Sequence, residues 1–168
     1  MIILGLDSST SITGWAFSQN GIVLDAGFIN TSKAENNRVR GQMIIKTLNE
    51  NKLIKETHHI NLEAALSGFG GGFTSQQTII TLSRWNAILE FMLQDAYSVP
   101  IVLCNVNTMR KKVLGAARVK GIKPKEYVRE KIPLIVPNIK SFEKLNRNGE
   151  WDAHNSDTYD AIVCSLFG

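Results

Sequence analysis

The chain has 168 residues, of which 43% are hydrophobic and 20% are charged, and its formal net charge is +4. These values predict one globular domain over residues 1–168 with a sizeable core. No apolar run approaches the 18 residues of a membrane span and no signal peptide opens the chain, so we expect a cytoplasmic protein rather than a membrane or secreted one. The two cysteines, Cys104 and Cys164, lie in apolar stretches without metal-ligand spacing, which is typical of reduced core thiols.

Positive charge is concentrated between residues 107 and 147. This segment holds twelve basic residues against three acidic ones, whereas the rest of the chain has seven basic and twelve acidic residues. A basic segment joined to an acid-bearing remainder favours a polyanionic ligand held beside carboxylates. The alternative is a solvated surface with a bias toward lysine.

Residues 2–29 predict three adjacent antiparallel strands. The apolar run of the first strand ends in Asp7, and a polar turn follows it. Asn20 and Gly21, between the second and third strands, form the strongest hairpin signal in the chain. A half-buried carboxylate such as Asp7 is costly unless it is paired or holds a metal. The alternative is that Asp7 only bonds the backbone of the following turn.

A helix and a short strand are predicted next. Residues 34–51 have helical spacing of apolar side chains after a cap at Thr31 and Ser32. Residues 58–63 predict a short strand with a second acid, Glu63, at its end.

The following stretch, residues 64–73, is a glycine-rich loop with Phe69 and Phe73 at its tips. These rings either stack on and wedge between nucleic-acid bases or pack into the core. Residues 76–96 predict a long helix that is apolar on more than one side. Such a helix is either central in the fold or shared with a second subunit.

The basic half of the chain predicts a strand over residues 100–106 and a short helix from 107 to 115. A second basic helix is expected over residues 125–132, where Pro133 stops it. Residues 141–150 are polar and charged, as in a mobile surface loop.

Two more acids lie on the last predicted helix. Asp157 and Asp160 are three residues apart, so their carboxylates project from one face. Favourable interaction with the helix dipole explains one acid near a helix start, but Asp160 leads directly into an apolar run. With Asp7 and Glu63 there are then four acids on elements with apolar sides. Clustered carboxylates repel unless cations neutralise them, and two Mg²⁺ or Mn²⁺ ions are the simplest solution.

Four motifs resemble those of the RuvC-type Holliday junction resolvases, in the same order and spacing. The first two are ILGLDSSTSITGWAFS at residues 3–18 and LEAALSGF at residues 62–69. The third is basic, NTMRKKVLG followed by KPKEYV, and the last is DTYDAIVCSL at residues 157–166. The resemblance covers nearly the whole chain. It leaves the host open between a bacterium, a phage and another DNA virus.

The resemblance implies an α/β fold of the RNase H-like type. Its mixed five-stranded sheet would begin with three antiparallel strands and be flanked by helices. It also implies a metal-dependent, structure-selective endonuclease that acts as a homodimer. Such an enzyme resolves four-way DNA junctions by paired symmetrical nicks that leave 5′-phosphate and 3′-hydroxyl ends.

By the same resemblance, Asp7, Glu63, Asp157 and Asp160 match the catalytic, metal-binding acids. Asp152 competes with Asp157 for its place, and His154 is near enough in sequence to approach the metals. The residues expected to contact DNA are Phe69, Phe73, Arg110, Lys111, Lys112, Arg118, Lys120, Lys123 and Lys125.

Three alternatives remain at this point. The same fold suits a less selective nuclease for flaps and forks, and it also suits a DNA-binding module without catalysis. The opening strand, acid and hairpin also resemble the phosphate-binding start of actin-like kinases and ATPases. Those proteins need a second similar domain and a second phosphate loop, and this chain has neither.

Overall fold

The first three strands pair in sequence order and form one side of the sheet. β1 (Ile2–Ser8), β2 (Ile12–Gln19) and β3 (Ile22–Asn30) are antiparallel. Asn20 and Gly21 connect β2 and β3 with φ angles of 52° and 78°, the positive values that a tight hairpin turn requires. The three predicted strands and their hairpin are therefore confirmed. The structure, a computed structural model, describes residues 1–65 and 76–168.

Two parallel strands complete the sheet. β4 (Thr57–Glu63) pairs with β1, and β5 (Ile101–Cys104) pairs with β4, which gives the strand order β3-β2-β1-β4-β5. Leu6 lies opposite Leu62 in the β1–β4 register. Because the carboxyl ends of parallel neighbours meet at one edge, the residues that follow these two leucines are brought together.

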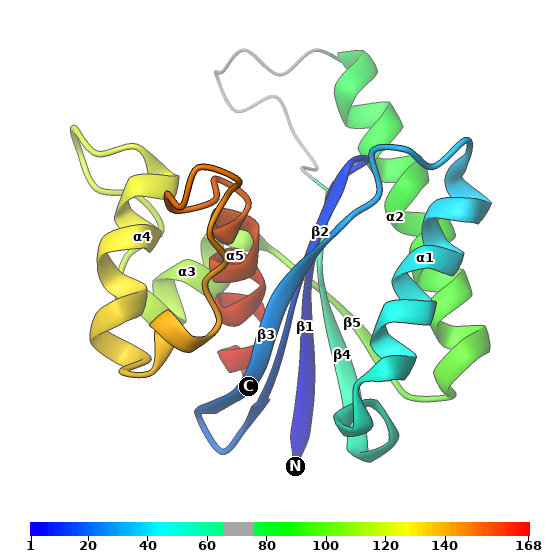
Figure 1. Ribbon diagram of the computed structural model, residues 1–168, viewed down its shortest axis with the longest axis horizontal. Helices are drawn as coiled ribbons and strands as arrows, with labels where there is room; N and C mark the ends of the chain where they lie inside the picture. The colour runs from blue at the N-terminus through cyan, green and yellow to red at the C-terminus, as the bar shows by residue number, and fades with distance from the viewer. Residues whose placement is uncertain (66–75) are drawn as a thin grey trace.

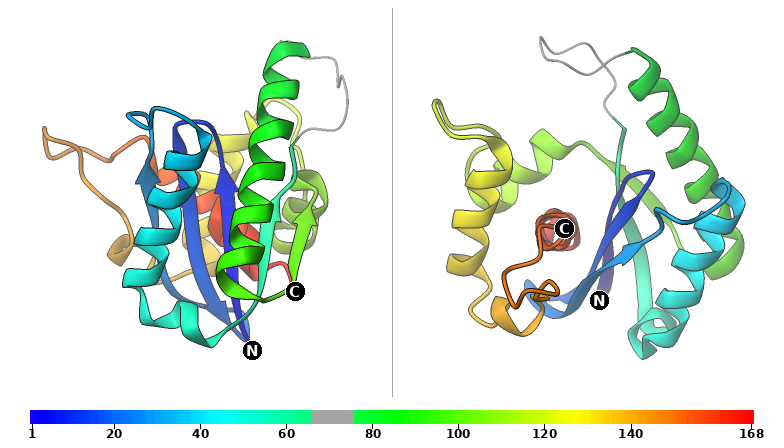
Figure 2. Two further views of the ribbon diagram at one scale, coloured as in Figure 1. Left: turned by 90° about the vertical axis from the view of Figure 1, so that its right-hand side faces the viewer. Right: turned by 45° about the horizontal axis from the view of Figure 1, so that its top comes forward.

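Helices cover both faces of the sheet (Figure 1). α1 (Asn37–Glu50) and α2 (Gln76–Tyr97) lie on one face, α1 leading into the short 3₁₀ helix η1 (Lys52–Glu56). α5 (Asn155–Leu166) packs on the other face. The helices α3 (Val106–Leu114) and α4 (Pro124–Ile135) pack against α5 from outside, followed by the 3₁₀ helix η2 (Ile139–Ser141). Seen end-on, α5 lies between the sheet and these outer helices (Figure 2).

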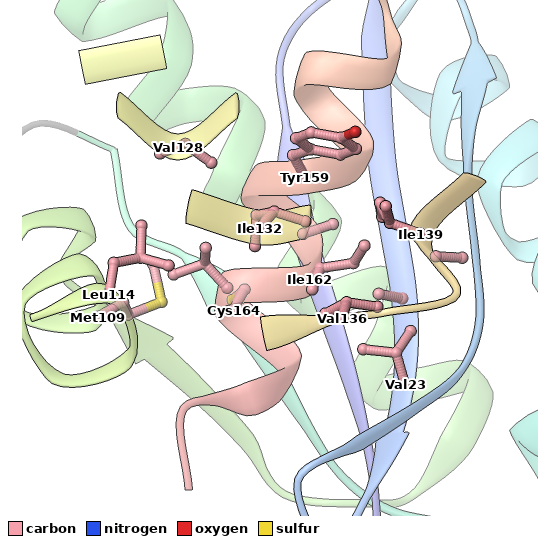
Figure 3. Packing of buried hydrophobic residues seen from close by; sticks show 14 of the residues in the cluster. Val23, Met109, Leu114, Val128, Ile132, Val136, Ile139, Tyr159, Ile162 and Cys164 are labelled. Atoms are coloured by element: carbon pink, nitrogen blue, oxygen red, sulfur yellow. The ribbon is translucent and has the colours of Figure 1, made fainter. Parts of the chain in front are cut away.

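Each face of the sheet has its own core. On the α1–α2 face, Leu4, Phe17 and Trp85 are fully buried in one apolar cluster. On the α5 face, side chains of α5 such as Ile162 pack between the sheet and Ile132 of α4 (Figure 3). α5 is therefore enclosed on two sides, which fixes the position of every side chain on its first turns.

Two glycines allow α5 to lie directly on the strands. A Cβ atom on Gly5 would overlap the backbone of Ser165, and one on Gly14 would overlap the carbonyl group of Asp157. Glycine at these positions removes the side chains that would otherwise hold the helix away from β1 and β2. The close approach brings the first turns of α5 to the sheet edge where β1 ends.

Three predicted helix boundaries were wrong. α1 begins after Asn36, whose side chain accepts a hydrogen bond from the N–H of Val39, so the cap lies later than Thr31 and Ser32. α3 is capped by Asn105 rather than Asn107. α4 continues past Pro133 to Ile135, because a proline in the last turn forfeits only one helical hydrogen bond.

Both cysteines are buried and form no disulfide, as predicted. None of the helices in residues 1–65 and 76–168 combines the length and apolar character that a membrane crossing requires.

Candidate active site

Two of the four predicted acids lie at the ends of neighbouring strands. Asp7 is the second-last residue of β1, and Glu63 is the last residue of β4. The turn after β1 is closed by Ser9, whose N–H donates to the carbonyl oxygen of Ile12 at 2.9 Å and whose hydroxyl accepts from the Ile12 N–H at 3.1 Å. The alternative role for Asp7, bonding this turn, is therefore filled by another residue.

Asp7 and Glu63 line the same pocket, which has a volume of about 330 Å³. Its wall includes two arginines from the basic segment, Arg110 and Arg118. Asn86 of α2 contributes a neutral polar side chain. The pocket thus combines carboxylates with guanidinium groups, as a site for a phosphate group and a cation would.

The third acid, Asp160, is buried on α5 and paired with an arginine. Its Oδ1 accepts a hydrogen bond from Nη2 of Arg110 at 2.7 Å, and the two side chains are only 5% and 10% exposed. Arg110 comes from α3, so the ion pair also joins α3 to α5. Within the described part of the chain, the Nε of this arginine has no hydrogen-bond partner. That Nε is also shielded from solvent, so it is not a donor open to the pocket.

The fourth acid, Asp157, lies one turn earlier on α5 with two basic neighbours. Nζ of Lys125, near the start of α4, is 3.1 Å from its Oδ1. Nδ1 of His154 is 3.5 Å from its Oδ2, and the ring of His154 lies beside that of Phe28. His154 therefore lies beside one of the four acids, and its approach to a metal stays a prediction.

Asp152 does not occupy the place of Asp157. Its Oδ1 accepts a hydrogen bond from the backbone N–H of His154 at 2.9 Å, which closes the turn ahead of α5. Asp157 is the acid whose charge acts on Asp7 and Glu63. Of the two competing acids, Asp157 therefore belongs to the cluster.

The acids raise one another's pKa. Burial raises the pKa of Asp7 well above its usual value, and the charges of Glu63, Asp160 and Asp157 raise it further. Burial and the charge of Asp160 raise the pKa of Glu63 to about 7, although Arg110 and Lys125 oppose this change. Burial also raises the pKa of Asp160, even beside Arg110. Burial first, and the neighbouring negative charges second, therefore favour the protonated forms of these acids.

Burial and the neighbouring carboxylates have opposite effects on the pKa of Lys125. Burial lowers its pKa, but the neighbouring carboxylates, Asp157 first, outweigh that effect and leave the pKa above its usual value. The lysine stays positively charged at neutral pH and is one of the cations that balance the acids.

The donor set fits a hard divalent cation by its chemistry. Carboxylates are the ligands that Mg²⁺ and Mn²⁺ prefer, and mutual elevation of pKa values marks a place where an added cation is favourable. In residues 1–65 and 76–168, however, no three His, Cys, Asp or Glu side chains are gathered into a complete metal site. Arg110 and Lys125 hold the two helix acids, so the four carboxylates are neighbours that do not converge on one point.

The predicted DNA-contacting residues divide into several groups. Arg110, Arg118 and Lys125 are at the acids, whereas Lys112 reaches the carbonyl oxygen of Gly168 and the ring of Phe167. From the helical rise, that end of α5 is roughly 10–15 Å from the acids. The remaining predicted lysines are exposed: Lys111, Lys120 and Lys123. Phe69 and Phe73 lie outside the described residues.

Two consecutive residues at this site were missed by the sequence reasoning. Trp85 donates a hydrogen bond to the hydroxyl of Ser8, and Asn86 donates one to the carbonyl oxygen of Glu63. The signal was a polar residue, Asn86, within the apolar face of a long helix.

Comparison with solved structures shows the same fold in Holliday junction resolvases. The Thermus thermophilus RuvC in complex with a Holliday junction matches with a TM-score of 0.63 and 16% identity, over 99% of this chain and 91% of that chain. Another Thermus thermophilus RuvC structure matches with a TM-score of 0.61 and 16% identity, over 99% and 92%. The yeast mitochondrial Holliday junction resolvase Ydc2 matches with a TM-score of 0.58 and 16% identity, over 98% and 75%.

At the level of sequence, neither a protein-family model nor a curated protein matches the chain. The fold is nevertheless clear: a mixed five-stranded α/β sheet of the RNase H-like type, arranged as in the RuvC resolvases. The predicted fold class and the resemblance to the RuvC type are confirmed.

Proposed function

We propose that this chain is a metal-dependent endonuclease that resolves four-way DNA junctions. The observation that carries the proposal is the pocket at the ends of β1 and β4, where Asp7 and Glu63 lie with Arg110 and Arg118. Asp160 is paired with Arg110, and Asp157 is paired with Lys125 of α4. The support for the proposal is that the surrounding fold is shared over nearly the full length with a resolvase bound to its junction. Fold alone does not fix an activity, so the site's chemistry carries the argument.

In this proposal, Asp7 and Glu63 are the principal ligands of the divalent cations. They end neighbouring strands and, among the described residues, have no basic partner as close as those of Asp157 and Asp160. Asp160 and Asp157 complete the ligand set when Arg110 and Lys125 turn to the DNA. Two bound Mg²⁺ or Mn²⁺ ions would supply an activated water and stabilise the leaving oxygen of a phosphodiester, which gives 5′-phosphate and 3′-hydroxyl ends.

The basic side chains bind and orient the scissile phosphate. Arg110 and Arg118 both line the pocket. A guanidinium group that faces the phosphate stabilises the charge that develops during attack. Lys125, which is 60% exposed, is placed to contact the backbone beside the cut.

A homodimer supplies the two sites that paired nicks require. α2 exposes three large apolar side chains, Ile80, Ile88 and Phe91, the last of them 73% exposed. Val102 and Leu103 on the edge strand β5 are also exposed, and a shallow pocket of about 210 Å³ lies between α2 and β5. These exposed apolar side chains form the proposed contact between the two copies.

A matched pair of variants tests the dimer. Phe91→Glu should give a monomer in light scattering coupled to gel filtration, because it places a charge in the apolar contact. Leu134→Glu is the control, since Leu134 is 72% exposed on α4, on the other side of the sheet. Equal mass for both variants and the parent would contradict the proposed contact surface.

The function is tested with a labelled, immobile four-way junction in Mg²⁺ beside a linear duplex, a flap and a fork of matching sequence. We expect paired symmetrical nicks in the junction, none with EDTA and none by Asp7→Asn. If the flap and the fork are cut as well as the junction, the proposed nuclease activity would stand but the proposed selectivity for junctions would be wrong. No cutting in Mg²⁺ or Mn²⁺, together with a thermal shift by ATP, would favour the actin-like alternative instead.

A further inference from the structure

Two adjacent residues in the middle of α2 each reach a different acid-bearing strand. Nε1 of Trp85 donates a hydrogen bond to the hydroxyl of Ser8 at 2.8 Å, and Ser8 is the residue after Asp7. Nδ2 of Asn86 donates a hydrogen bond to the backbone carbonyl oxygen of Glu63 at 2.7 Å. One turn of one helix therefore contacts the ends of both β1 and β4.

The contact to β1 is a short buried network. Trp85 is fully buried, and the Ser8 hydroxyl that it contacts is also 3.2 Å from the hydroxyl of Thr13 on β2. The guanidinium group of Arg40, from α1, lies 5.2 Å from the centre of the Trp85 ring. Three elements, α2, β1 and β2, thus meet at Ser8, and α1 contacts the Trp85 ring of this network. A buried network of this kind fixes geometry because each lost partner leaves a polar group unsatisfied.

The contact to β4 is made to the backbone of the acidic residue, Glu63. Asn86 is 7% exposed and lines the pocket, and its amide holds the carbonyl group of Glu63 where the strand ends. Directly after Glu63, the N–H of Ala64 donates to the carbonyl oxygen of Cys104. The direction in which Glu63 leaves the sheet is therefore set on one side by β5 and on the other by Asn86.

We infer that Trp85 and Asn86 are positioning residues that set the placement of Asp7 and Glu63 relative to each other. The inference rests on the proposed function for its kinetic consequence, but the geometric part stands on these hydrogen bonds alone. Neither residue touches a reacting atom in this assignment. Packing without positioning is the competing explanation for a buried tryptophan on an apolar helix.

Carbon-13 NMR of the carboxyl groups tests the geometry without any nuclease assay. In protein labelled at Asp and Glu side chains, Asp7 and Glu63 are assigned with Asp7→Asn and Glu63→Gln. Trp85→Phe should move the Asp7 resonance, and Asn86→Leu should move the Glu63 resonance, each by more than the other acids move. Unmoved resonances in both variants would overturn the inference, whether or not the parent cuts DNA.

Two control variants lose comparable hydrogen bonds elsewhere. Trp151→Phe removes the indole bond to Glu143, and Thr81→Val removes a hydroxyl bond within α2. Both should leave the Asp7 and Glu63 resonances in place. If either control moves them as far as Trp85→Phe or Asn86→Leu does, a general loss of packing explains the effect and positioning is rejected.

Measurements of kcat, junction Kd and Tm distinguish a loss of positioning from a loss of stability. For Trp85→Phe and Asn86→Leu, we expect kcat on a saturating junction to fall roughly 10-fold with junction Kd unchanged, since small misplacements of reacting groups cost rate. Ser8→Ala, which keeps the Trp85 ring packed, should lower kcat similarly, and the double variant with Trp85→Phe should be no worse than either. Additive losses, or a fall in Tm without a fall in kcat, would contradict the shared hydrogen bond.

Discussion

Asp7 and Glu63 end two strands, whereas Asp157 and Asp160 occupy the first turns of a helix, and the protein balances the charges of these two pairs differently. Each helix acid has a basic partner within 3.1 Å, Lys125 for Asp157 and Arg110 for Asp160. In residues 1–65 and 76–168 the strand acids have no such ion pair, and the pKa of Glu63 rises to about 7 through burial and the charge of Asp160. The helix pair thus has cationic partners from within the chain, which the strand pair lacks in these residues.

The difference follows from how each pair is placed. The strand pair is set by the sheet: β1 and β4 are parallel neighbours, so their ends coincide. The helix pair is set by the glycines that let α5 lie on β1 and β2, and its basic partners come from α3 and α4 on the outer side. A ligand phosphate would compete for Arg110 and Lys125, and that competition would release the helix acids toward a metal. Substitution of Asp7 or Glu63 should therefore affect catalysis most. Disruption of the buried ion pair of Asp160 should affect folding most.

The largest expected effect is on catalysis. Asp7→Asn should reduce junction cleavage by at least about 1000-fold, because the groups around a bound metal act as a unit. Junction affinity should stay within a few-fold of the parent, since the basic side chains are untouched. Single-turnover cleavage and fluorescence anisotropy measure the two quantities.

Asp152→Asn is the matched control for this variant. Asp152 caps the turn ahead of α5, and asparagine preserves that hydrogen bond, so cleavage should be retained. Loss of cleavage in Asp152→Asn, with activity kept in Asp157→Asn, would replace Asp157 by Asp152 in the acid cluster.

These acids could be predicted from the sequence because the signals are local. Asp7 ends an apolar run, Glu63 ends a strand, and the spacing of Asp157 and Asp160 fits one helix face. The partner of Asp160 is Arg110, fifty residues away, and no periodicity shows that α3 packs against α5 at that point. The roles of Trp85 and Asn86 were hidden for the same reason: a tryptophan on an apolar face indicates packing, and its N–H partner depends on tertiary structure. Helix starts were missed where several capping residues competed, as between Ser32 and Asn36.

The second expected effect is on folding. Arg110→Gln leaves the buried Asp160 carboxylate without its cation, which should lower the free energy of unfolding by about 3 kcal/mol. The deficit should be larger at pH 8 than at pH 5, because the arginine stabilises only the ionised form of Asp160. Urea unfolding at both pH values measures it.

Lys111→Gln serves as the control, since Lys111 is an exposed neighbour on the same helix. Its unfolding curve should match that of the parent at both pH values. A stability for Arg110→Gln equal to that of Lys111→Gln would mean that the Arg110–Asp160 pair contributes nothing net to folding.

The third prediction concerns Glu63 of the strand pair, and here the substitution should raise the free energy of unfolding instead of lowering it. The pKa of Glu63 is raised from 4.5 to about 7 in the folded chain, so between these values the folded state holds a proton that the unfolded chain has lost. The unfolding free energy of the metal-free protein should therefore fall as the pH rises from about 4.5 to about 7. Glu63→Gln removes this penalty and should be more stable than the parent at pH 8, by about 3 kcal/mol at most, with no gain at pH 4.

Thermal unfolding in EDTA across this pH range measures the gain, with Glu56→Gln as the control on an exposed glutamate before β4. An equal gain in the control would assign the effect to net charge. A loss of stability in Glu63→Gln at pH 8 would show that Glu63 is held by a cation of the chain, like the helix acids.

The smallest effect concerns the exposed half of the helix pair. Lys125 is 60% exposed, so Lys125→Gln should change the free energy of unfolding by less than about 1 kcal/mol. Its loss should instead appear in DNA binding, where the slope of log affinity against log salt should fall by about 1. Lys112→Gln is the control from the same basic segment, because Lys112 lies at the far end of α5. A changed slope for Lys125 alone would limit the DNA contact to the acid end of α5. Equal changes in the slope for both variants would extend the DNA contact along α3 as far as Lys112, away from both acid pairs.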